Sequence, residues 1–195
     1  MIVLRHATLD DAPAVAAIHN QGIAARGATF DTEPRTPADA AARIRDGRSH
    51  PQLVAVDGGT VVGWAGLSPY RSRACYAGIA EVSVYVDTAA RGRGIGSQLL
   101  RGVVEAAADA GFWKLVSRVF PFNNASRAAC RAAGFREVGT YEKHARLDGR
   151  WLDVVIVERL IHRNLIADQD PNSGTPVTGG DPATHPNPAA EAAIA

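Results

Sequence analysis

A basic, glycine-rich turn at residues 91–96, Arg-Gly-Arg-Gly-Ile-Gly, has residue types and spacing that suit binding of an anion. Glycine lets the backbone bend tightly and approach a ligand without Cβ atoms in the way. The unpaired first amides of a following helix, with Arg91 and Arg93, would favour a phosphate or pyrophosphate. Alone, the hexapeptide suits a plain connection equally well. Its glycines match neither a Walker loop nor the G-x-G-x-x-G fingerprint.

The residues on either side of this turn predict a strand and then a helix. Residues 81–87, Glu-Val-Ser-Val-Tyr-Val-Asp, alternate with period two, which is typical of a strand. Apolar residues at helical spacing form one stripe after the turn: Ile95, Leu99, Val103 and Ala107. The turn is therefore expected at a helix N-terminus, where anions bind.

In this context the sequence resembles the GCN5-related N-acetyltransferase (GNAT) family. There a strand leads into an Arg/Gln-x-x-Gly-x-Gly/Ala loop that holds the pyrophosphate of acetyl-CoA, and residues 91–96 match every specified position. The stretch from Asn123 through Cys130 to Gly134-Phe135 is similar to the family's second cofactor segment. The resemblance covers roughly residues 2–161. It narrows toward phosphinothricin and arsinothricin acetyltransferases on five stretches: residues 18–20, 28–31 with 34–36, 68–76, 81–85 and 148–154.

The resemblance implies that acetyl-CoA is held by the turn, by the strand before it and by the second segment. The main chain of residues 84–86 would pair with the pantetheine arm like an added strand, and a backbone amide there would stabilise the oxyanion. The same valines also suit simple core packing. The implied cofactor-binding residues are Val84, Tyr85, Val86, Arg91, Gly92, Arg93, Gly94, Ile95, Gly96, Asn123 and Cys130.

Acyl transfer to an amine needs a base, because an ammonium group is not a nucleophile. Glu81 begins the motif strand, and the resemblance assigns this role to the glutamate before Val-Ser; a solvated or salt-bridged strand-end carboxylate is the alternative. The leaving-group acid stays open. Where the family often has tyrosine or histidine, this chain has Cys130, which suits packing better than proton donation. Tyr85, Tyr141 or water would substitute.

The acceptor site is expected around residues 70–76. Guanidinium groups hold carboxylates and other oxyanions through two parallel hydrogen bonds, so Arg71 and Arg73 with Tyr76 suit an amino acid that bears a second acidic group. Phe30, in the loop after the first helix, lies in the region that borders the acceptor pocket in the resembled family. Solvated surface arginines and ordinary packing of Phe30 are the alternatives.

The resulting expectation is an N-acetyltransferase that moves the acetyl group of acetyl-CoA to the α-amine of a small anionic amino-acid analogue. Phosphinothricin, arsinothricin and methionine sulfoximine are compounds of this type. Two alternatives remain: an acetyl-CoA-binding sensor of the same fold without turnover, and an acetyltransferase for another amine or a protein N-terminus. An aminoglycoside acceptor would require an acidic pocket, whereas residues 70–76 are basic.

Composition limits the other classes. The chain has 195 residues, 46% of them hydrophobic, and a net charge of +1, without the Lys/Arg tract that nucleic-acid binding favours. Its two cysteines fit neither a zinc site nor a disulfide framework, and no metal spacing appears among its histidines. Without an apolar leader or a run of about 20 apolar residues, a soluble cytoplasmic protein is expected, with no membrane partner and a homodimer left open.

The predicted architecture is an α/β (α+β) GNAT-like fold, with a mixed central sheet of about 6–7 strands and about four helices. The clearest hairpin joins residues 52–56 and 60–67 through Asp57-Gly-Gly59. Gly66 and Gly78 would thin the sheet near a ligand, or serve turns. The acetyltransferase domain is expected at residues 1–163. A Pro/Ala-rich tail, residues 164–195, is predicted to be disordered because it has too few large apolar groups to bury.

Overall fold

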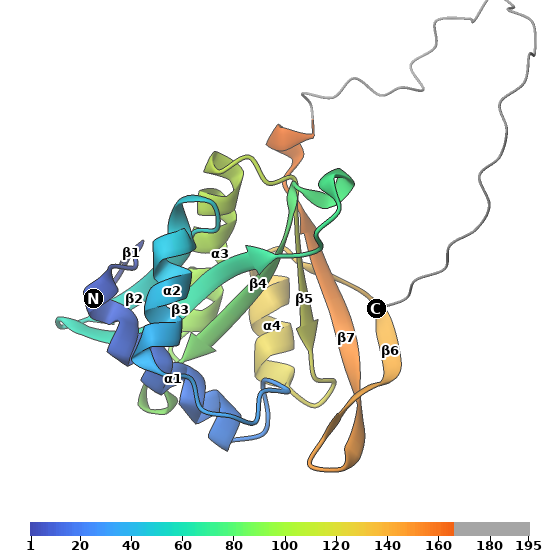
Figure 1. Ribbon diagram of the computed structural model, residues 1–195, viewed down its shortest axis with the longest axis horizontal. Coiled ribbons are helices and arrows are strands. Elements are labelled where there is room, and N and C mark those ends of the chain that lie inside the picture. The colour runs from blue at the N-terminus through green and yellow to red at the C-terminus, as the bar shows by residue number, and fades with distance from the viewer. Residues whose placement is uncertain (166–195) are drawn as a thin grey trace, which may run out of the picture.

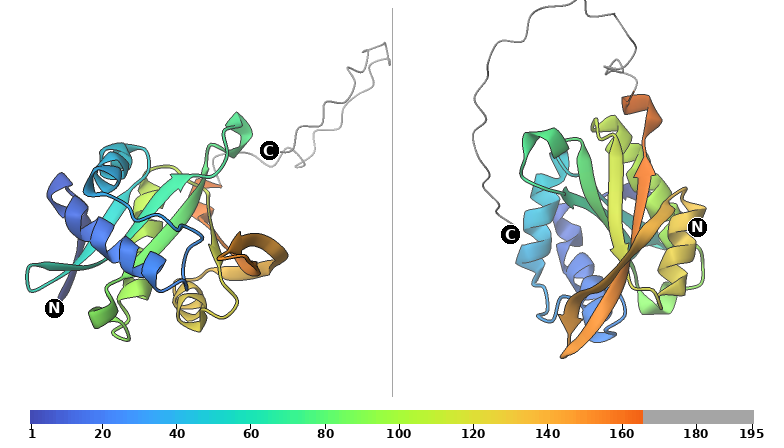
Figure 2. Two further views of the ribbon diagram at one scale, coloured as in Figure 1. Left: turned by 60° about the horizontal axis from the view of Figure 1, so that its bottom comes forward. Right: turned by 90° about the vertical axis from the view of Figure 1, so that its right-hand side faces the viewer.

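A seven-stranded sheet with helices on both faces makes up residues 1–165, which are the residues that the computed structural model describes (Figures 1 and 2). The strands are β1 (Ile2–His6), β2 (Gln52–Asp57), β3 (Thr60–Pro69), β4 (Ile79–Val86), β5 (Lys114–Val119), β6 (Arg136–Leu147) and β7 (Arg150–Leu160). The α-helices are α1 (Ala12–Ala24), α2 (Pro37–Arg45), α3 (Ile95–Asp109) and α4 (Asn124–Ala132). The strand and helix numbers confirm the expected fold.

The strand order is β1-β2-β3-β4-β5-β7-β6. The predicted hairpin of β2 and β3 is present, and β4 pairs antiparallel with β3. Between β4 and β5 the pairing is parallel and short, from Ile79 opposite Lys114 to Glu81 opposite Val116. Beyond these residues the two strands diverge (Figure 1). The sheet therefore opens at its centre, directly after Glu81.

One face of the sheet packs against α3 and α4. The stripe that the sequence predicted on α3, Ile95, Leu99, Val103 and Ala107, is at most 1% exposed. It meets inward-facing residues of β2–β5, such as Ala65, Val82 and Leu115, in the largest hydrophobic cluster. Burial of this stripe fixes the direction of α3, and with it the direction in which the helix N-terminus points.

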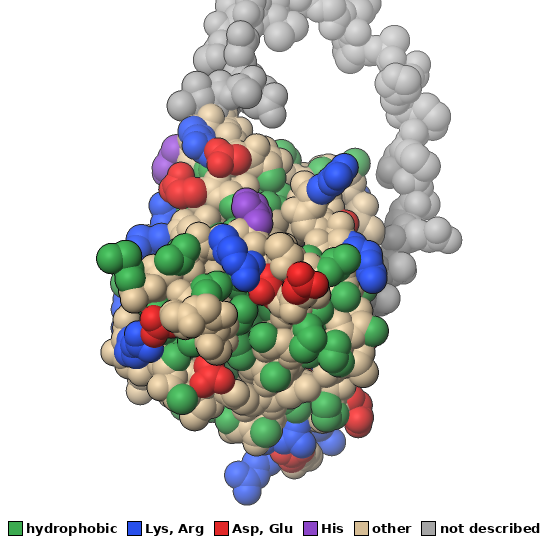
Figure 3. Space-filling view, turned by 90° about the vertical axis from the view of Figure 1, so that its left-hand side faces the viewer, with side chains coloured by type: hydrophobic (Ala, Val, Ile, Leu, Met, Phe, Trp, Pro, Cys, Tyr) green, Lys and Arg blue, Asp and Glu red, His purple; other side chains and the backbone are tan. Residues whose placement is uncertain are grey.

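The other face packs against α1 and α2. Trp64 is 2% exposed and lies with Val54 under Ala16, Ile18 and Ala40. A proline at the first position of α2 and a reciprocal cap between Thr36 and Asp39 begin that helix. On the side of the molecule that carries β1, acidic and basic side chains are interspersed (Figure 3).

Protein side chains fill the space beside Gly66 and Gly78, which corrects the expectation that these glycines thin the sheet for a ligand. Gly66 lies inside β3, whereas Gly78 lies in the turn before β4, as the alternative interpretation predicted. A Cβ at Gly66 would collide with the side chain of Gln52, and a Cβ at Gly78 with the ring of Trp113. The rings and side chains of the protein thus occupy the space that a ligand was expected to fill. Gln52 in turn donates to the carbonyl oxygens of His50 and Leu67, at 3.0 and 2.7 Å.

The chain packs past the predicted domain boundary at residue 163. The side-chain amide of Asn164 donates to the carbonyl oxygens of Ala108 and Phe112, both at 2.8 Å. The domain therefore includes at least Asn164. The predicted tail lies, from residue 166 onward, outside the described residues.

Candidate active site

The turn between β4 and α3 presents unpaired backbone amides at the start of the helix. Gly92 and Gly94 have φ angles of 77° and 74°, which favour glycine. Gly94 is the N-cap residue, and the first backbone bond of the helix runs from Gln98 to Gly94. Within residues 1–165 the amides of Ile95, Gly96 and Ser97 have no acceptor. Together with the helix dipole, they suit an anion.

The glycines keep the space above these amides open. A Cβ at Gly92 would meet nothing within 4 Å, and one at Gly96 would make only ordinary contacts, 3.7 Å to Val86 and 3.8 Å to Ala129. Packing within the protein therefore does not require glycine at residue 96. The open space beside residue 96 has room for the pyrophosphate that the sequence resemblance implies at this turn.

A groove of about 680 Å³ leads from this turn along β4 to α4. Because β5 leaves β4 after Glu81, residues 82–86 of β4 keep one edge free of strand pairing, as an added pseudo-strand requires. Asn123 closes the far side: its side chain caps α4 by accepting from Ser126 at 3.0 Å and donates to Gly27 at 2.9 Å. The predicted residues that line the groove are Val84, Tyr85, Val86, Arg91, Gly92, Gly94, Ile95, Gly96 and Asn123.

A second cavity, of about 300 Å³, adjoins the groove and shares Val84, Tyr85 and Asn123 with it. Glu81 lines this cavity, with its side chain 27% exposed. Its Oε1 accepts from Arg118 Nη1 of β5 at 2.5 Å. Glu81 is thus an ionic partner and an accessible base at once, at the mouth of the opening between β4 and β5.

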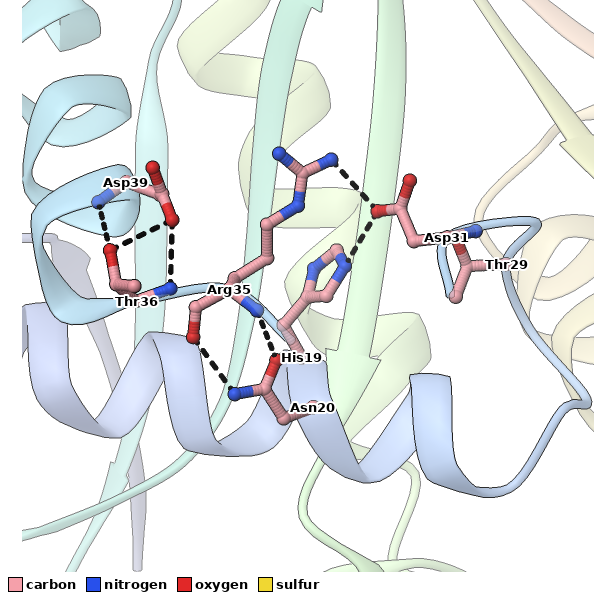
Figure 4. Close-up of polar contacts among 7 residues, drawn as sticks. All are labelled: His19, Asn20, Thr29, Asp31, Arg35, Thr36 and Asp39. Carbon is pink, nitrogen blue, oxygen red and sulfur yellow. Dashed lines mark hydrogen bonds and ion pairs between the residues drawn. The ribbon is translucent and has the colours of Figure 1, made fainter. Parts of the chain in front are cut away.

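The loop between α1 and α2 forms one wall of this cavity and is fixed by a polar network (Figure 4). Asp31 accepts from Arg35 at 2.9 Å and lies 3.1 Å from His19 Nε2. The side-chain amide of Asn20 donates to the carbonyl oxygen of Arg35, and its oxygen accepts from the backbone amide of Arg35. Phe30, beside Asp31, lines the cavity and packs edge-on against Phe120 at 4.9 Å. These bonds hold the wall in one position.

Charges in the network follow from burial and hydrogen bonding. Burial lowers the pKa of His19 although its bond to Asp31 opposes this, so the imidazole is neutral at pH 7 and donates from Nε2. Burial would raise the pKa of Asp31, but the hydrogen bonds from Arg35 and His19 outweigh burial and leave that pKa below its ordinary value. Asp31 is therefore ionised, and it lines the same cavity as Glu81. Its negative charge is balanced by Arg35.

One hydroxyl group and one thiol group at the cavity, those of Tyr85 and Cys130, stay protonated. Burial raises the pKa of Tyr85, whose ring stacks on Trp64 at a centroid distance of 5.1 Å and lies tilted against His19 at 4.6 Å. Burial also raises the pKa of Cys130 to about 11. Cys130 lines the cavity beside Glu81 and not the groove. Tyr141 is 55% exposed and lines neither, so Tyr85 is the better placed of the two tyrosines.

Four predicted residues lie away from both cavities. Arg93 pairs with Asp57 of β2 at 2.7 Å and does not line the groove. Arg71 and Arg73 are exposed in the connection between β3 and β4, and Tyr76 stacks edge-on against Tyr70 at 5.9 Å. None of these last three lines the cavity that contains Glu81.

The sequence interpretation missed Arg118 and the pair of His19 with Asp31. Arg118 is a charged residue within β5, and a charge in a strand is a signal that the side chain faces a cleft, a partner or solvent. His19 and Asp31 lie 12 residues apart on a helix and a loop, and their contact depends on the path of that loop. Among residues 1–165, no helix is long and apolar enough to cross a membrane, and no cluster of metal-ligand side chains is found.

Comparison with known proteins agrees with this geometry. The sequence model described as the acetyltransferase (GNAT) family matches residues 18–135. A phosphinothricin N-acetyltransferase of Streptomyces coelicolor is 34% identical over 166 residues, with 81% of this chain and 95% of that protein covered. The L-methionine sulfoximine/L-methionine sulfone acetyltransferase of Pseudomonas aeruginosa is 34% identical over 161 residues, with 80% and 92% covered.

A solved structure extends the likeness to three dimensions. The phosphinothricin acetyltransferase of Sinorhizobium meliloti, solved in complex with acetyl-CoA, superposes with a TM-score of 0.79 at 30% sequence identity. The match covers 91% of this chain and 97% of that structure.

Proposed function

The chain belongs to the acetyltransferase (GNAT) family, and from that membership we propose that it moves the acetyl group of acetyl-CoA to the α-amine of a small anionic amino-acid analogue. Phosphinothricin, arsinothricin and methionine sulfoximine define the acceptor type. Relatives that are named for phosphinothricin and methionine sulfoximine support this choice.

One observation carries the proposal. The groove that suits acetyl-CoA and the cavity that contains Glu81 adjoin at Val84 and Tyr85, in the part of β4 beyond its pairing with β5. An acyl group delivered along the groove would therefore end beside a carboxylate. Holding two reactants in this way supplies much of the rate of a bimolecular reaction.

The residues divide the work of acyl transfer. The thioester supplies an activated acyl group when acetyl-CoA is bound. Amides at the start of α3 hold the pyrophosphate, and a backbone amide of β4 stabilises negative charge on the carbonyl oxygen. Glu81 takes one proton of the acceptor ammonium, directly or through water, so that the free amine attacks the carbonyl carbon. The protonated Tyr85 gives a proton to the leaving thiolate, and the second proton that the nitrogen loses as the amide forms replaces it.

An acceptor panel tests the proposal. Purified protein is incubated with acetyl-CoA and one amine at a time, and free thiol is measured. We expect anionic amino-acid analogues to release thiol much faster than plain amines. Thiol release only with a peptide N-terminus would overturn the acceptor class, and binding of acetyl-CoA without thiol release from any amine would favour a sensor.

Arg71 and Arg73 are proposed to hold the side-chain acid of the acceptor when the connection that carries them folds over the cavity. Replacing either residue by lysine keeps the charge and loses the planar fork. The specificity constant for phosphinothricin should then fall by roughly 10- to 100-fold, as for one charge-assisted hydrogen bond, with acetyl-CoA affinity unchanged. If the lysine variants keep the parent's preference for anionic analogues over plain amines, Arg71 and Arg73 do not hold the acid, and residues 141–150 would be tested next.

A further inference from the structure

We propose that Arg118 binds the α-carboxylate of the acceptor, so that Glu81 and Arg118 together recognise a zwitterionic α-amino acid. The inference rests on the proposed function and names a residue that decides its specificity. Both side chains line the 300 Å³ cavity, and they remain 27% and 40% exposed. They therefore face open space while touching each other.

The strands place the two charges on the same side of the sheet. Glu81 lies opposite Val116 at the last paired position of β4 and β5. Side chains alternate along a strand, so Arg118, two residues beyond Val116, projects to the same face as Val116. Ser83 and Tyr85 share that face with Glu81 and line the same cavity. The floor of the cavity thus carries one carboxylate, Glu81, and one guanidinium group, Arg118, where the two strands separate.

Each member of the pair keeps an unused edge. The bond joins Glu81 Oε1 to Arg118 Nη1. Within residues 1–165, Glu81 Oε2 and the Nε and Nη2 atoms of Arg118 have no hydrogen-bond partner. A guanidinium group has five donors in a fixed plane and a carboxylate has two acceptor oxygens, so the pair binds a second partner on each side without breaking.

A zwitterionic α-amino acid carries the complementary charges on one carbon atom. Its ammonium group would donate to Glu81 Oε2, the atom that then takes the proton. Its carboxylate would accept from the free edge of Arg118. With its ammonium group on Glu81 and its carboxylate on Arg118, the amino acid would be held in one orientation. A plain amine has no carboxylate and would contact Glu81 alone.

The neighbouring charges leave this role to Arg118. Arg35 lies in a bond to Asp31, and the charge of Asp31 is in turn balanced. Arg71 and Arg73 lie outside the cavity and are proposed to hold the side-chain acid. Arg118 is therefore the guanidinium group that contacts Glu81, the predicted base.

The test compares phosphinothricin with its α-carboxamide, which keeps the amine and the side chain but loses the carboxylate charge. In the parent, the acid should have the higher kcat/KM. In Arg118→Gln the acid-to-amide ratio should fall about 10- to 100-fold, mainly through a higher KM for the acid. Glu81 also loses its ionic partner in this variant, but that loss should change kcat/KM by the same factor for the acid and the carboxamide. The ratio of the two values therefore isolates the contact with the carboxylate.

The matched control is Arg131→Gln. Arg131 also pairs with a glutamate, Glu137 at 3.1 Å, but lies on α4 outside the cavity. Its acid-to-amide ratio should equal that of the parent. If Arg118→Gln does not fold, Arg118→Lys keeps the charge beside Glu81 and should lose part of the ratio through loss of the fork.

The outcomes separate the two proposals. A parent that acetylates neither phosphinothricin nor any other anionic amino acid refutes the proposed function before a variant is made. A parent that prefers the acid, with an Arg118→Gln variant that keeps the full preference, refutes only the role of Arg118. A fall in kcat that is equal for acid and amide likewise refutes it, because Arg118 would then act only through Glu81.

Discussion

At the scale of single residues, Glu81 is the side chain that is proposed to carry the acid–base step. Glu81→Gln keeps the shape of the side chain and an oxygen that accepts from Arg118, but the amide cannot take a proton. We expect kcat to fall by about 10²–10⁴-fold, with acetyl-CoA affinity little changed because Glu81 lies outside the groove. The loss should shrink at high pH, where more of the acceptor is free amine.

Steady-state kinetics across pH and calorimetry with acetyl-CoA measure these effects. Glu105→Gln, on the exposed side of α3, is the control and should behave as the parent. A Glu81→Gln variant that is equally active at neutral pH would transfer the role to water or to another group.

At the scale of an element, the start of α3 is predicted to hold the pyrophosphate. Gly96→Val tests this, because the φ angle of residue 96 is not positive and the new side chain has room within the protein. It would, however, occupy the space above the amides. Acetyl-CoA affinity should fall roughly tenfold or more, with an unchanged or slightly higher Tm, since valine is the better helix former.

Calorimetric titration and a melting curve measure both quantities. Gly139→Val makes the same change on β6, where a Cβ meets nothing within 4 Å, and should leave affinity unchanged. Parent-like affinity in Gly96→Val would remove the turn from the cofactor site.

The start of α1 depends on a partly buried ion pair between Arg5 and Asp11. Asp11 is 6% exposed and receives bonds of 2.6 and 2.8 Å from Arg5, and its pKa is lowered to about 2, chiefly by these bonds. A lowered pKa stabilises the fold above the unfolded value of 3.8, and this contribution is lost as pH falls through about 2.

Asp11→Asn should therefore lower the free energy of unfolding by about 2 kcal/mol at pH 6, and by about half as much at pH 3. Urea unfolding at the two pH values measures the difference. Asp10→Asn, at the exposed neighbouring position, is the control. A difference between Asp11→Asn and the parent that does not shrink between pH 6 and pH 3 would show that the ion pair is not its source.

At the scale of the whole molecule, local patterns predicted most of the fold. The strand before the turn at residues 91–96, the apolar stripe of α3 and the hairpin of β2 and β3 follow from periodicity and turn residues within a short stretch. The site was predicted less completely. The bond between Glu81 and Arg118 depends on where β4 and β5 stop pairing, which is set by packing of distant segments.

Deletion of residues 166–195 tests the predicted domain organisation. Their composition offers few large apolar side chains, so their removal should leave Tm and acetyltransferase activity unchanged. The shortened chain keeps Asn164 and its two bonds to the end of α3 and the residues after it. A large fall in Tm or activity would show that the deleted segment contributes to the folded domain.

The central claim is transfer of an acetyl group to an α-amine, and following the group itself tests it most directly. Acetyl-CoA labelled with ¹³C at the acetyl carbonyl is mixed with the protein and phosphinothricin, and NMR follows the label while free thiol is measured in parallel. The account predicts that the label appears in an amide on the α-nitrogen at the rate at which thiol appears. Label that appears as free acetate, or no thiol release at all, would contradict it.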